Sequence, residues 1–357
     1  MLKYLKESAN DYDISKIASE LCEAAKYLGV LEEKIRSYHF ERILIPLLHK
    51  KEAISSMQIE GTQTTMTDIF EEEIKNQPSQ DKTALEVSNH TKAIIKGAEY
   101  LRKEPFTHEF IQEIHKIMLE GVISPKLQHS LGKYKEKDNK IVNSAKTVIF
   151  TPPSHTETIS YMNELIDYMN RDDDGTLPLI KAAIIHSQFE SIHPFDDGNG
   201  RVGRLLISLY FYKAKLINFP FFYISEAFGQ EKTVYYNKLT DSRTNSFTEW
   251  IRFFLRKCIV QAQSHIRYID SLNELYEKTK KIVKESLRSP TFESVTECLF
   301  TQPVLTASYL SNRLNISSVQ AKRYLDTLEA AQVLQTDDRQ RYKRFFFVEL
   351  LDLALRV

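Results

Sequence analysis

The residues best suited to chemistry lie close together, in the stretch IHPFDDGNGRVGR at positions 192–204. The chain has only 10 glycines in 357 residues, and three of them fall here: Gly198, Gly200 and Gly203. A glycine-rich turn that leads into a helix presents unpaired backbone N–H groups and the positive end of the helix dipole, which favour a phosphate. Arg201 and Arg204 lie three residues apart on the first turn of that helix, so they can hold separate phosphates.

Two further side chains would complete a reaction site. Asp197 offers a carboxylate that can bind Mg²⁺ bridging those phosphates. His193 precedes the loop, and a neutral imidazole near pH 7 suits a general base that removes a proton from a hydroxyl group. The pattern predicts nucleotide–Mg²⁺ binding with attack by a hydroxyl. The alternative is a capped helix turn whose charges only face water, and the density of these groups within one loop argues against it.

The letters GNGRVG also match the dinucleotide fingerprint G-x-G-x-x-G, which requires a strand before the first glycine. The segment before this loop, LIKAAIIHSQFESI, has helical apolar spacing and ends at a His-Pro pair, so a Rossmann unit is not expected. A Walker A loop is excluded because no Gly-Lys-Ser/Thr follows. His186, two helical turns before His193, is expected to be a hydrogen-bonded core residue.

Apolar spacings of three and four predict that helices position this loop. The expected helices are 14–37, 39–60, 85–103, 107–121, 156–170, 178–192, 203–217, 232–242 and 247–286. Residues 132–151 contain two short β-prone pieces around a polar turn, which predict a β-hairpin on the helical body.

The last 70 residues read as a separate unit. Two amphipathic helices, LTASYLSNRL and SSVQAKRYLDTLEAAQVL, are followed by a basic turn and a strand-like FFFVEL, the pattern of a winged helix-turn-helix. The fold class is therefore mainly α, a helical bundle with a small hairpin and a C-terminal winged helix-turn-helix. The predicted domains are 1–84, 85–286 and 287–357.

Composition adds few constraints. Lys+Arg and Asp+Glu balance at 48 each, so overall charge predicts no polyanionic partner, and any such surface must be local. The three cysteines show no zinc spacing and are expected to be reduced thiols. The N-terminus lacks an apolar signal segment, and no run of about 18 apolar residues occurs. We therefore expect a soluble, cytoplasmic protein without membrane contact.

The glycine-rich stretch resembles the motif of the Fic family (filamentation induced by cyclic AMP), since HPFDDGNGRVGR fills every fixed position of HPFx(D/E)GNGRxxR. The segment EAISSMQIEGTQTTMTDI resembles one found near the N-terminus of many Fic proteins, and a winged helix is a frequent C-terminal companion in the family. The resemblance implies a Fic-type helical bundle and a protein adenylyltransferase. Such enzymes transfer AMP from ATP to a Ser, Thr or Tyr hydroxyl of a target protein, or of themselves, and release pyrophosphate.

The resemblance implies roles for single residues. His193 would activate the target hydroxyl, Phe195 would anchor the loop, and Asp197 would bind Mg²⁺. The residues expected to contact the phosphates of ATP are Asp197, Gly198, Asn199, Gly200, Arg201, Val202, Gly203 and Arg204. Among them, Asn199 would hold the α-phosphate, and the two arginines would hold the β- and γ-phosphates. Glycine at position 200 favours nucleotidyl transfer, because the family's protein-kinase branch has lysine there.

Two further regions gain implied roles. Tyr235 and Tyr236 would line the nucleotide pocket, whereas Arg243 stands where the family has an asparagine near adenine, which leaves the base preference open. The 132–151 hairpin would be the flap that aligns a target segment by strand addition. The expected docking residues are Ile141, Val142 and Asn143.

Residues 56–61, SMQIEG, resemble the family's inhibitory motif (S/T)xxxE(G/N). Ser56 and Glu60 lie four apart, on one helix face. The resemblance implies that Glu60 pairs with Arg204, removes the partner of the γ-phosphate and represses transfer. An exposed glutamate at a helix end is the alternative reading.

Other functions remain open at this point. The same site can remove AMP, or transfer another group such as UMP or phosphocholine. The chain can instead act mainly as a transcriptional regulator, which the winged helix supports, although the surplus of basic side chains in residues 317–344 is modest, six against four acidic. Winged helices also bind proteins, and a homodimer is a further possible assembly.

Overall fold

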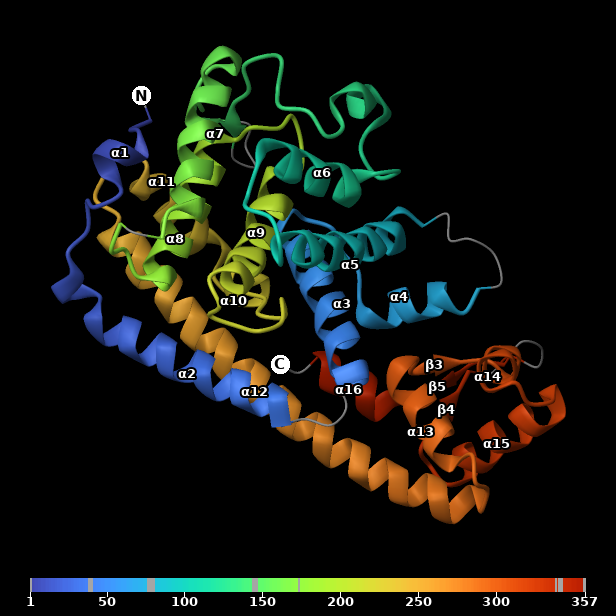
Figure 1. Ribbon diagram of the computed structural model, residues 1–357. Helices are drawn as coiled ribbons and strands as arrows, with labels where there is room; N and C mark the ends of the chain where they lie inside the picture. The colour runs from blue at the N-terminus through green and yellow to red at the C-terminus, as the bar shows by residue number, and fades with distance from the viewer. Residues whose placement is uncertain are drawn as a thin grey trace.

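The computed structural model describes residues 2–37, 41–75, 81–142, 147–172, 174–337, 339 and 343–355, and helices dominate it (Figure 1). The helices of the body are α1 (Leu5–Ser8), α2 (Ala18–Ser37), α3 (Glu41–Ile59), α4 (Met66–Glu73), α5 (Lys82–Leu101), α6 (His108–Leu119), α7 (His155–Asn170), α8 (Pro178–Ile192), α9 (Asn199–Lys213), α10 (Ser225–Gln230), α11 (Lys232–Ser242) and α12 (Thr248–Leu287), with 3-10 helices η1 (Ile14–Lys16) and η2 (Pro125–Ser130).

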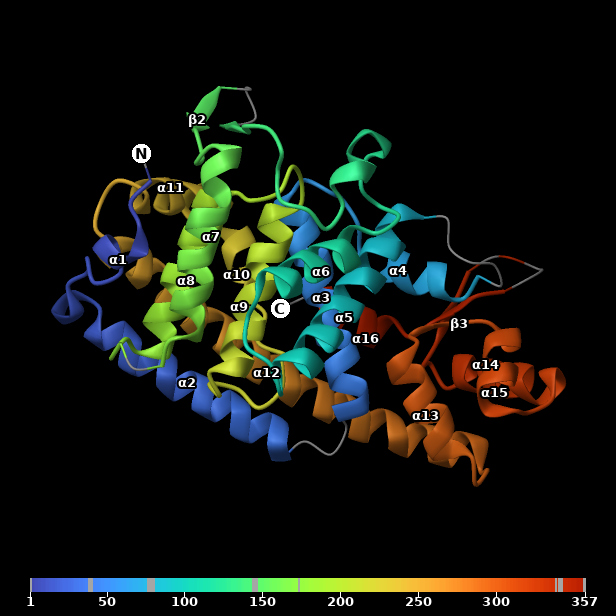
Figure 2. The ribbon, with the colours of Figure 1, turned by 45° about the horizontal axis from the view of Figure 1, so that its top comes forward.

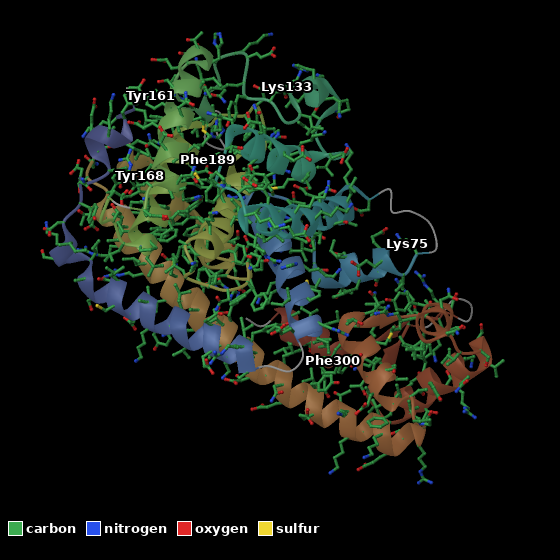
Figure 3. All side chains as sticks on the ribbon, viewed as in Figure 1. Lys75, Lys133, Tyr161, Tyr168, Phe189 and Phe300 are labelled. Carbon is green, nitrogen blue, oxygen red and sulfur yellow. The ribbon has the colours of Figure 1, made fainter. Side chains whose placement is uncertain are left out.

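Helix α8 forms the centre of the body. Every residue from Leu179 to Ile192 is buried, as expected for a helix that is apolar on nearly all sides. It packs against α7, α9 and α12, and Phe189 lies among these helices in Figure 3. The loop of interest joins the end of α8 to the start of α9, so both of its ends are fixed in the core.

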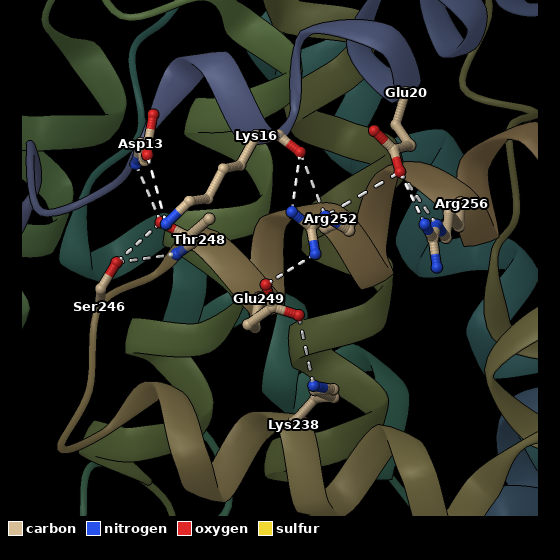
Figure 4. A network of polar contacts seen from close by, with 9 residues as sticks. All are labelled: Asp13, Lys16, Glu20, Lys238, Ser246, Thr248, Glu249, Arg252 and Arg256. Carbon is tan, nitrogen blue, oxygen red and sulfur yellow. Dashed lines mark hydrogen bonds and ion pairs between the residues drawn. The ribbon is translucent and has the colours of Figure 1, made fainter.

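Helices α2 and α12 lie side by side along one edge of the molecule (Figure 1). Arginines of α12 bind the N-terminal segment in the network of Figure 4. Arg252 donates from Nε and Nη2 to the carbonyl of Lys16, at 3.2 and 2.9 Å, and Arg256 donates to Glu20 Oε1 at 3.1 and 2.8 Å. Helix α12 is 40 residues long and continues from this edge to the C-terminal elements.

The C-terminal elements lie at the far end of α12 (Figure 1). They are α13 (Phe292–Thr301), β3 (Val304–Leu305), α14 (Ala307–Leu314), α15 (Ser318–Ala330), β4 (Gln335–Thr336), β5 (Phe345–Phe346) and α16 (Val348–Leu355). The three strands form an antiparallel sheet in the order β3-β5-β4. Ser317 caps α15 by accepting from the Gln320 N–H.

The end of the chain differs from the prediction. The strand-like FFFVEL is a strand only at Phe345–Phe346, and α16 begins at Val348. The segment VELLDLAL has helical apolar spacing, which explains the change. Helices α4 and α10, of 8 and 6 residues, are absent from the prediction because so few turns show little periodicity.

The predicted hairpin consists of β1 (Ile141–Val142) and β2 (Val148–Phe150), which pair antiparallel. Figure 2 shows β2 standing off the helical body near α7. The predicted boundary at residue 84 falls inside α5, which packs against α3. Among the described residues, no helix is long and apolar enough to cross a membrane.

Candidate functional site

The loop after α8 has an unusual backbone. His193 ends the helix with φ 49°, in the left-handed region, and Gly198 caps the start of α9 with φ 80°. A side chain at position 198 would also meet Leu119, whose Cδ1 would lie 2.6 Å from a Cβ there. The turn therefore needs glycine at this position for two reasons, the φ angle and the close approach of α6.

Alanine in place of Gly198 is expected to lower the free energy of unfolding by about 2–4 kcal/mol, since left-handed strain and overpacking add. Gly175→Ala is the matched control: Gly175 has φ 69° but no atom within 4 Å of a built Cβ, so only the strain of about 1–2 kcal/mol is expected. Urea unfolding measures both values, and equal losses would show that the contact with Leu119 adds nothing.

The predicted base, His193, is partly buried beside the end of α8. Burial lowers the pKa of its imidazole to about 4, an effect that the carbonyl of Glu190, 3.4 Å from Nδ1, only partly opposes. The ring is therefore neutral at pH 7, the form that can accept a proton.

The loop is anchored by an aromatic ring and an amide. Phe195 is fully buried, and its ring lies 3.9 Å from the ring of His115. Asn199 Oδ1 accepts from the Phe195 N–H at 2.9 Å, while Asn199 Nδ2 donates to the Phe195 carbonyl at 2.8 Å. The amide predicted to hold the α-phosphate thus bonds within the loop itself.

His115 is a loop contact that the sequence analysis missed. Its Nδ1 accepts from the Gly132 N–H at 3.0 Å, so the proton lies on Nε2, which donates to the Asp197 carbonyl at 3.1 Å. Burial lowers the pKa of His115 to about 4, which keeps the ring neutral. A histidine in an amphipathic helix carries no local signal for such a contact, because its partner is 82 residues away in the sequence.

Asp197 and Arg201 lie together at the start of α9. Asp197 Oδ1 accepts from the Gly198 N–H at 2.6 Å and from Arg201 Nη2 at 3.0 Å, and the Asp197 side chain is 43% exposed. Arg201 also pairs with Glu86 of α5. The described residues contain no group of three or more His, Cys, Asp or Glu that could hold a metal ion. One exposed carboxylate beside the predicted phosphate-binding turn nevertheless fits Mg²⁺, which takes few protein ligands and binds largely through phosphates and water.

The second arginine of the motif contacts the distant helix α3. Arg204 is 1% exposed, and its Nη2 donates to Glu60 Oε1 at 2.7 Å and to the Ser56 carbonyl at 3.0 Å. Its Nε donates to Ser56 Oγ at 3.0 Å. Burial raises the pKa of the Glu60 carboxyl, but the charge and hydrogen bond of Arg204 outweigh it, so the net shift is downward. Glu60 is therefore an anion at neutral pH.

The Glu60 carboxylate lies directly over the glycine turn. A Cβ built on Gly200 would overlap Glu60 Oε1 and would come within 2.9 Å of Arg204 Nη1. Helix α3 brings the carboxylate here because it ends at Ile59 and Gly61 turns the chain with φ 100°. The Glu60 carboxylate therefore lies between the glycine turn and Arg204, the two groups that the sequence predicts to bind phosphate.

The two predicted pocket tyrosines have different positions. Tyr235 is 0% exposed, and its hydroxyl lies 2.9 Å from His186 Nε2, so it belongs to the packed core beneath the site. Burial raises the pKa of the Tyr236 hydroxyl well above its ordinary value, and the charges of Glu60 and Arg204 also act on this hydroxyl, which places it near the ion pair. His186 is buried and hydrogen-bonded, as predicted.

The hairpin exposes apolar side chains. Val142, Val148 and Ile149 are 49%, 46% and 40% exposed, while Ile141 pairs with Phe150. Of the predicted docking residues, Ile141 and Val142 lie on β1, whereas Asn143 lies outside the described residues.

Arg243 connects the hairpin to the last turn of α8. Its guanidinium carbon lies 4.3 Å from the centre of the Phe150 ring, and its Nε donates to Ser191 Oγ at 3.3 Å. A cation therefore occupies this side of the site, at the position where the resemblance places an asparagine in the family.

Comparison with known proteins gives two family matches, to the Fic/DOC family at residues 105–211 and to the Fic/DOC family N-terminal at residues 18–99. A probable protein adenylyltransferase of Aquifex aeolicus is 26% identical over 175 residues, 49% of this chain and 51% of that protein. The protein adenylyltransferase fic-1 of Caenorhabditis elegans is 39% identical over 61 residues, 17% of this chain and 12% of that protein. The chain thus spans about half the length of the first relative and less of the second.

Solved structures share the fold. A Fic family protein from Desulfovibrio desulfuricans G20 aligns with a TM-score of 0.59 at 17% identity, covering 93% of this chain and 95% of that one. A Fic domain containing signaling protein from Bacteroides thetaiotaomicron aligns with a TM-score of 0.53 at 21% identity, covering 68% of this chain and 97% of that one. The prediction of a mainly α fold of this type is confirmed.

Proposed function

Because the chain belongs to the Fic/DOC family, we propose that it is a protein adenylyltransferase that transfers AMP from ATP to a hydroxyl group of a target protein, and that Glu60 represses it. The observation that carries the proposal is the ion pair between Glu60 and Arg204 over the glycine turn. This ion pair joins the SMQIEG segment to the glycine-rich motif, although Glu60 and Arg204 are 144 residues apart in the sequence.

In the proposed reaction, His193 takes the proton of the target hydroxyl while the hydroxyl oxygen bonds to the α-phosphorus of ATP. The bond to the β-phosphate oxygen breaks, and pyrophosphate leaves. Arg201 and Arg204 neutralise the charge of the leaving group, and the first backbone N–H groups of α9 orient the phosphates. Asp197 would hold Mg²⁺, which supplies charge neutralisation at the phosphates when bound.

Repression follows from the same contacts. A γ-phosphate on Arg204 requires the guanidinium to leave Glu60, and the carboxylate would repel the phosphate at short range. ATP therefore binds with its α-phosphate out of line with the attacking hydroxyl. The neutral His193 is ready at pH 7, so the block concerns phosphate placement rather than the base.

The nucleotide itself is the part of the proposal to test first. The Glu60→Gly variant, incubated with each of the four α-labelled nucleoside triphosphates, should incorporate label from ATP. Preferential incorporation from UTP would show that the chain transfers UMP instead. This is a real alternative because Arg243, beside the flap, stands where the family has an asparagine near adenine, so the base preference is open. Loss of AMP from a protein modified beforehand would indicate that the site removes the group.

We propose duplex DNA binding by the C-terminal unit, as a winged helix, as a second function. One observation favours it: Val319 is 81% exposed at the start of α15, and the exposed Lys322 and Arg323 follow on the same helix. The basic surface is nevertheless limited, because Lys322 pairs with Asp326, and Lys343 and Arg344 of the following turn also pair with acidic side chains. Two other expectations, that the chain forms a homodimer and that it is cytoplasmic, stay predictions.

Reversing both charges on α15, Lys322→Glu with Arg323→Glu, is expected to weaken retention of the full chain on duplex DNA by at least about tenfold at 50 mM salt. Lys92→Glu with Lys96→Glu on α5 makes the same charge change elsewhere and should have little effect. Absence of retention of the unmodified chain at low salt would refute the DNA proposal and leave a protein partner for this face.

A further inference from the structure

Two residues outside the glycine-rich motif bond to four successive carbonyls of the loop, those of residues 192–195. Both lie in the first part of the predicted flap, residues 132–151, before its first strand β1. The bonds are from Lys135 Nζ to Ile192 at 3.2 Å, from Asn139 Nδ2 to His193 at 3.1 Å, from the Lys135 N–H to Pro194 at 2.8 Å, and from Asn139 Nδ2 to Phe195 at 3.2 Å. Lys135 Nζ also donates to Asn139 Oδ1 at 2.8 Å, so the two side chains hold each other.

The backbone at this point needs outside donors. A helix that ends on a left-handed residue usually satisfies its last carbonyls with the N–H groups of the next two residues. Here His193 has φ 49°, and the next residue, Pro194, has no N–H. The left-handed conformation is unfavourable for a residue with a Cβ and persists only where the surroundings impose it. Lys135 Nζ donates to the carbonyl of Ile192, the last residue of α8, and the carbonyls of the three residues beyond the helix accept from Asn139 Nδ2 and the Lys135 N–H, so these bonds hold the backbone on both sides of His193.

Lys135 is an unusual residue for this position. It is 3% exposed, and none of the ion pairs found among the described residues includes it. Its ammonium lies against the carbonyl oxygens of Ile192 and of the Asn139 side chain, and the more distant carboxylates of Asp138 and Asp196 also offset its charge. A buried ammonium without a directly paired carboxylate is costly, so its contacts with the loop need an explanation beyond packing.

The second member of the pair connects to the flap. Asn139 lies two residues before β1, which begins at Ile141, and one side-chain amide spans the carbonyls on both sides of Pro194. A shift of the segment before β1 would therefore move the backbone that carries His193. The phosphate-binding part of the loop, from Gly198 onward, makes none of these contacts.

We propose that Lys135 and Asn139 are positioning residues, which hold the left-handed backbone at His193 and couple the orientation of its imidazole to the flap. The inference rests on the proposed role of His193 as the base. The loop then has two parts with different functions. Residues 192–195 orient the proton acceptor and move with the flap, and the part from Gly198 onward binds phosphate.

The kinetic test uses the Glu60→Gly protein as parent, so that transfer is measurable. Asn139→Asp keeps the acceptor for Lys135 and nearly the same shape, but it loses both donations to the loop. We expect kcat to fall about 100-fold, the scale of a misplacement near 1 Å, with KM for ATP within about threefold of the parent. Asn139→Ala should act similarly, and Lys135→Arg should retain transfer within about tenfold.

Lys137→Met is the matched control, because Lys137 is an exposed lysine of the same segment, and it should leave both constants unchanged. An equal loss of kcat and of ATP affinity in Asn139→Asp would mean that the whole loop collapses and would overturn the positioning role. Unchanged kcat in both Asn139 variants would overturn it as well.

Hydrogen exchange of the amides at residues 192–199 gives a reading that does not depend on activity. We expect these amides to exchange at least tenfold faster in Asn139→Ala than in the parent. In Lys137→Met they should exchange at the parent rate. If exchange stays at the parent rate, the coupling proposal is wrong, whatever the enzyme transfers. If exchange rises but the parent transfers no AMP, the proposed function is wrong, and the contact between flap segment and loop stands.

Discussion

Replacing Glu60 with glycine is expected to raise the initial rate of AMP transfer by at least about 30-fold. The variant removes one charge-assisted hydrogen bond, which contributes roughly 1.5–3 kcal/mol in proteins. The Glu60 side chain is 38% exposed, so solvent screening favours the lower part of that range, about 2 kcal/mol, which corresponds to about 30-fold. Arg204 keeps its bonds to Ser56 and stays in place to meet a phosphate.

Two further variants separate charge from flexibility. Glu60→Gln keeps the shape and removes the charge, so its rate should lie between those of the unmodified chain and Glu60→Gly. Gln58→Gly loosens the same helical turn but leaves the partner of Arg204 intact, and its rate should stay near that of the unmodified chain. A rise in Gln58→Gly as large as in Glu60→Gly would attribute release to a mobile helix end rather than to the ion pair.

Removing the base is expected to have the larger effect. In the Glu60→Gly background, His193→Ala should lower kcat by about 100- to 10,000-fold, the usual contribution of a positioned general base. Affinity for ATP should change little, because the imidazole makes no phosphate contact in the proposed reaction. Steady-state transfer and equilibrium binding of ATP measure the two quantities.

His129→Ala is the control for this variant, since His129 is exposed on η2 and should leave transfer unchanged. A kcat of the His193→Ala protein within about threefold of that of its parent would show that His193 is not the general base. The neutral state of the imidazole, which burial maintains, would then need another explanation.

Much of the fold follows from local pattern. Helix α8 begins and ends at the predicted residues 178 and 192, because a strong apolar run lies between Pro178 and the His-Pro pair. Helix α9 begins at Asn199 rather than at the predicted 203, since glycine lowers helix propensity and hides the start. Gly198 supplies a left-handed cap there, which apolar spacing cannot reveal.

The site was less predictable from local pattern. The proximity of Glu60 and Arg204 was expected only from the resemblance of two motifs, because no spacing rule joins residues 144 positions apart. Lys135 and Asn139 lie in the polar segment KEKDN, where charged and amide side chains normally face water. Their role depends on where the chain folds back over Pro194, and that is a tertiary contact without a sequence signal.

The position of the transferred label tests the central claim most directly. The unmodified chain and the Glu60→Gly variant are each incubated with Mg²⁺ and ATP labelled at either the α- or the γ-phosphate, and protein-bound label is counted. We predict that Glu60→Gly takes up the α-label at least about 30-fold faster than the unmodified chain, and that neither protein takes up the γ-label. Equal α-label uptake by the two proteins, or uptake of the γ-label, would contradict repressed AMP transfer.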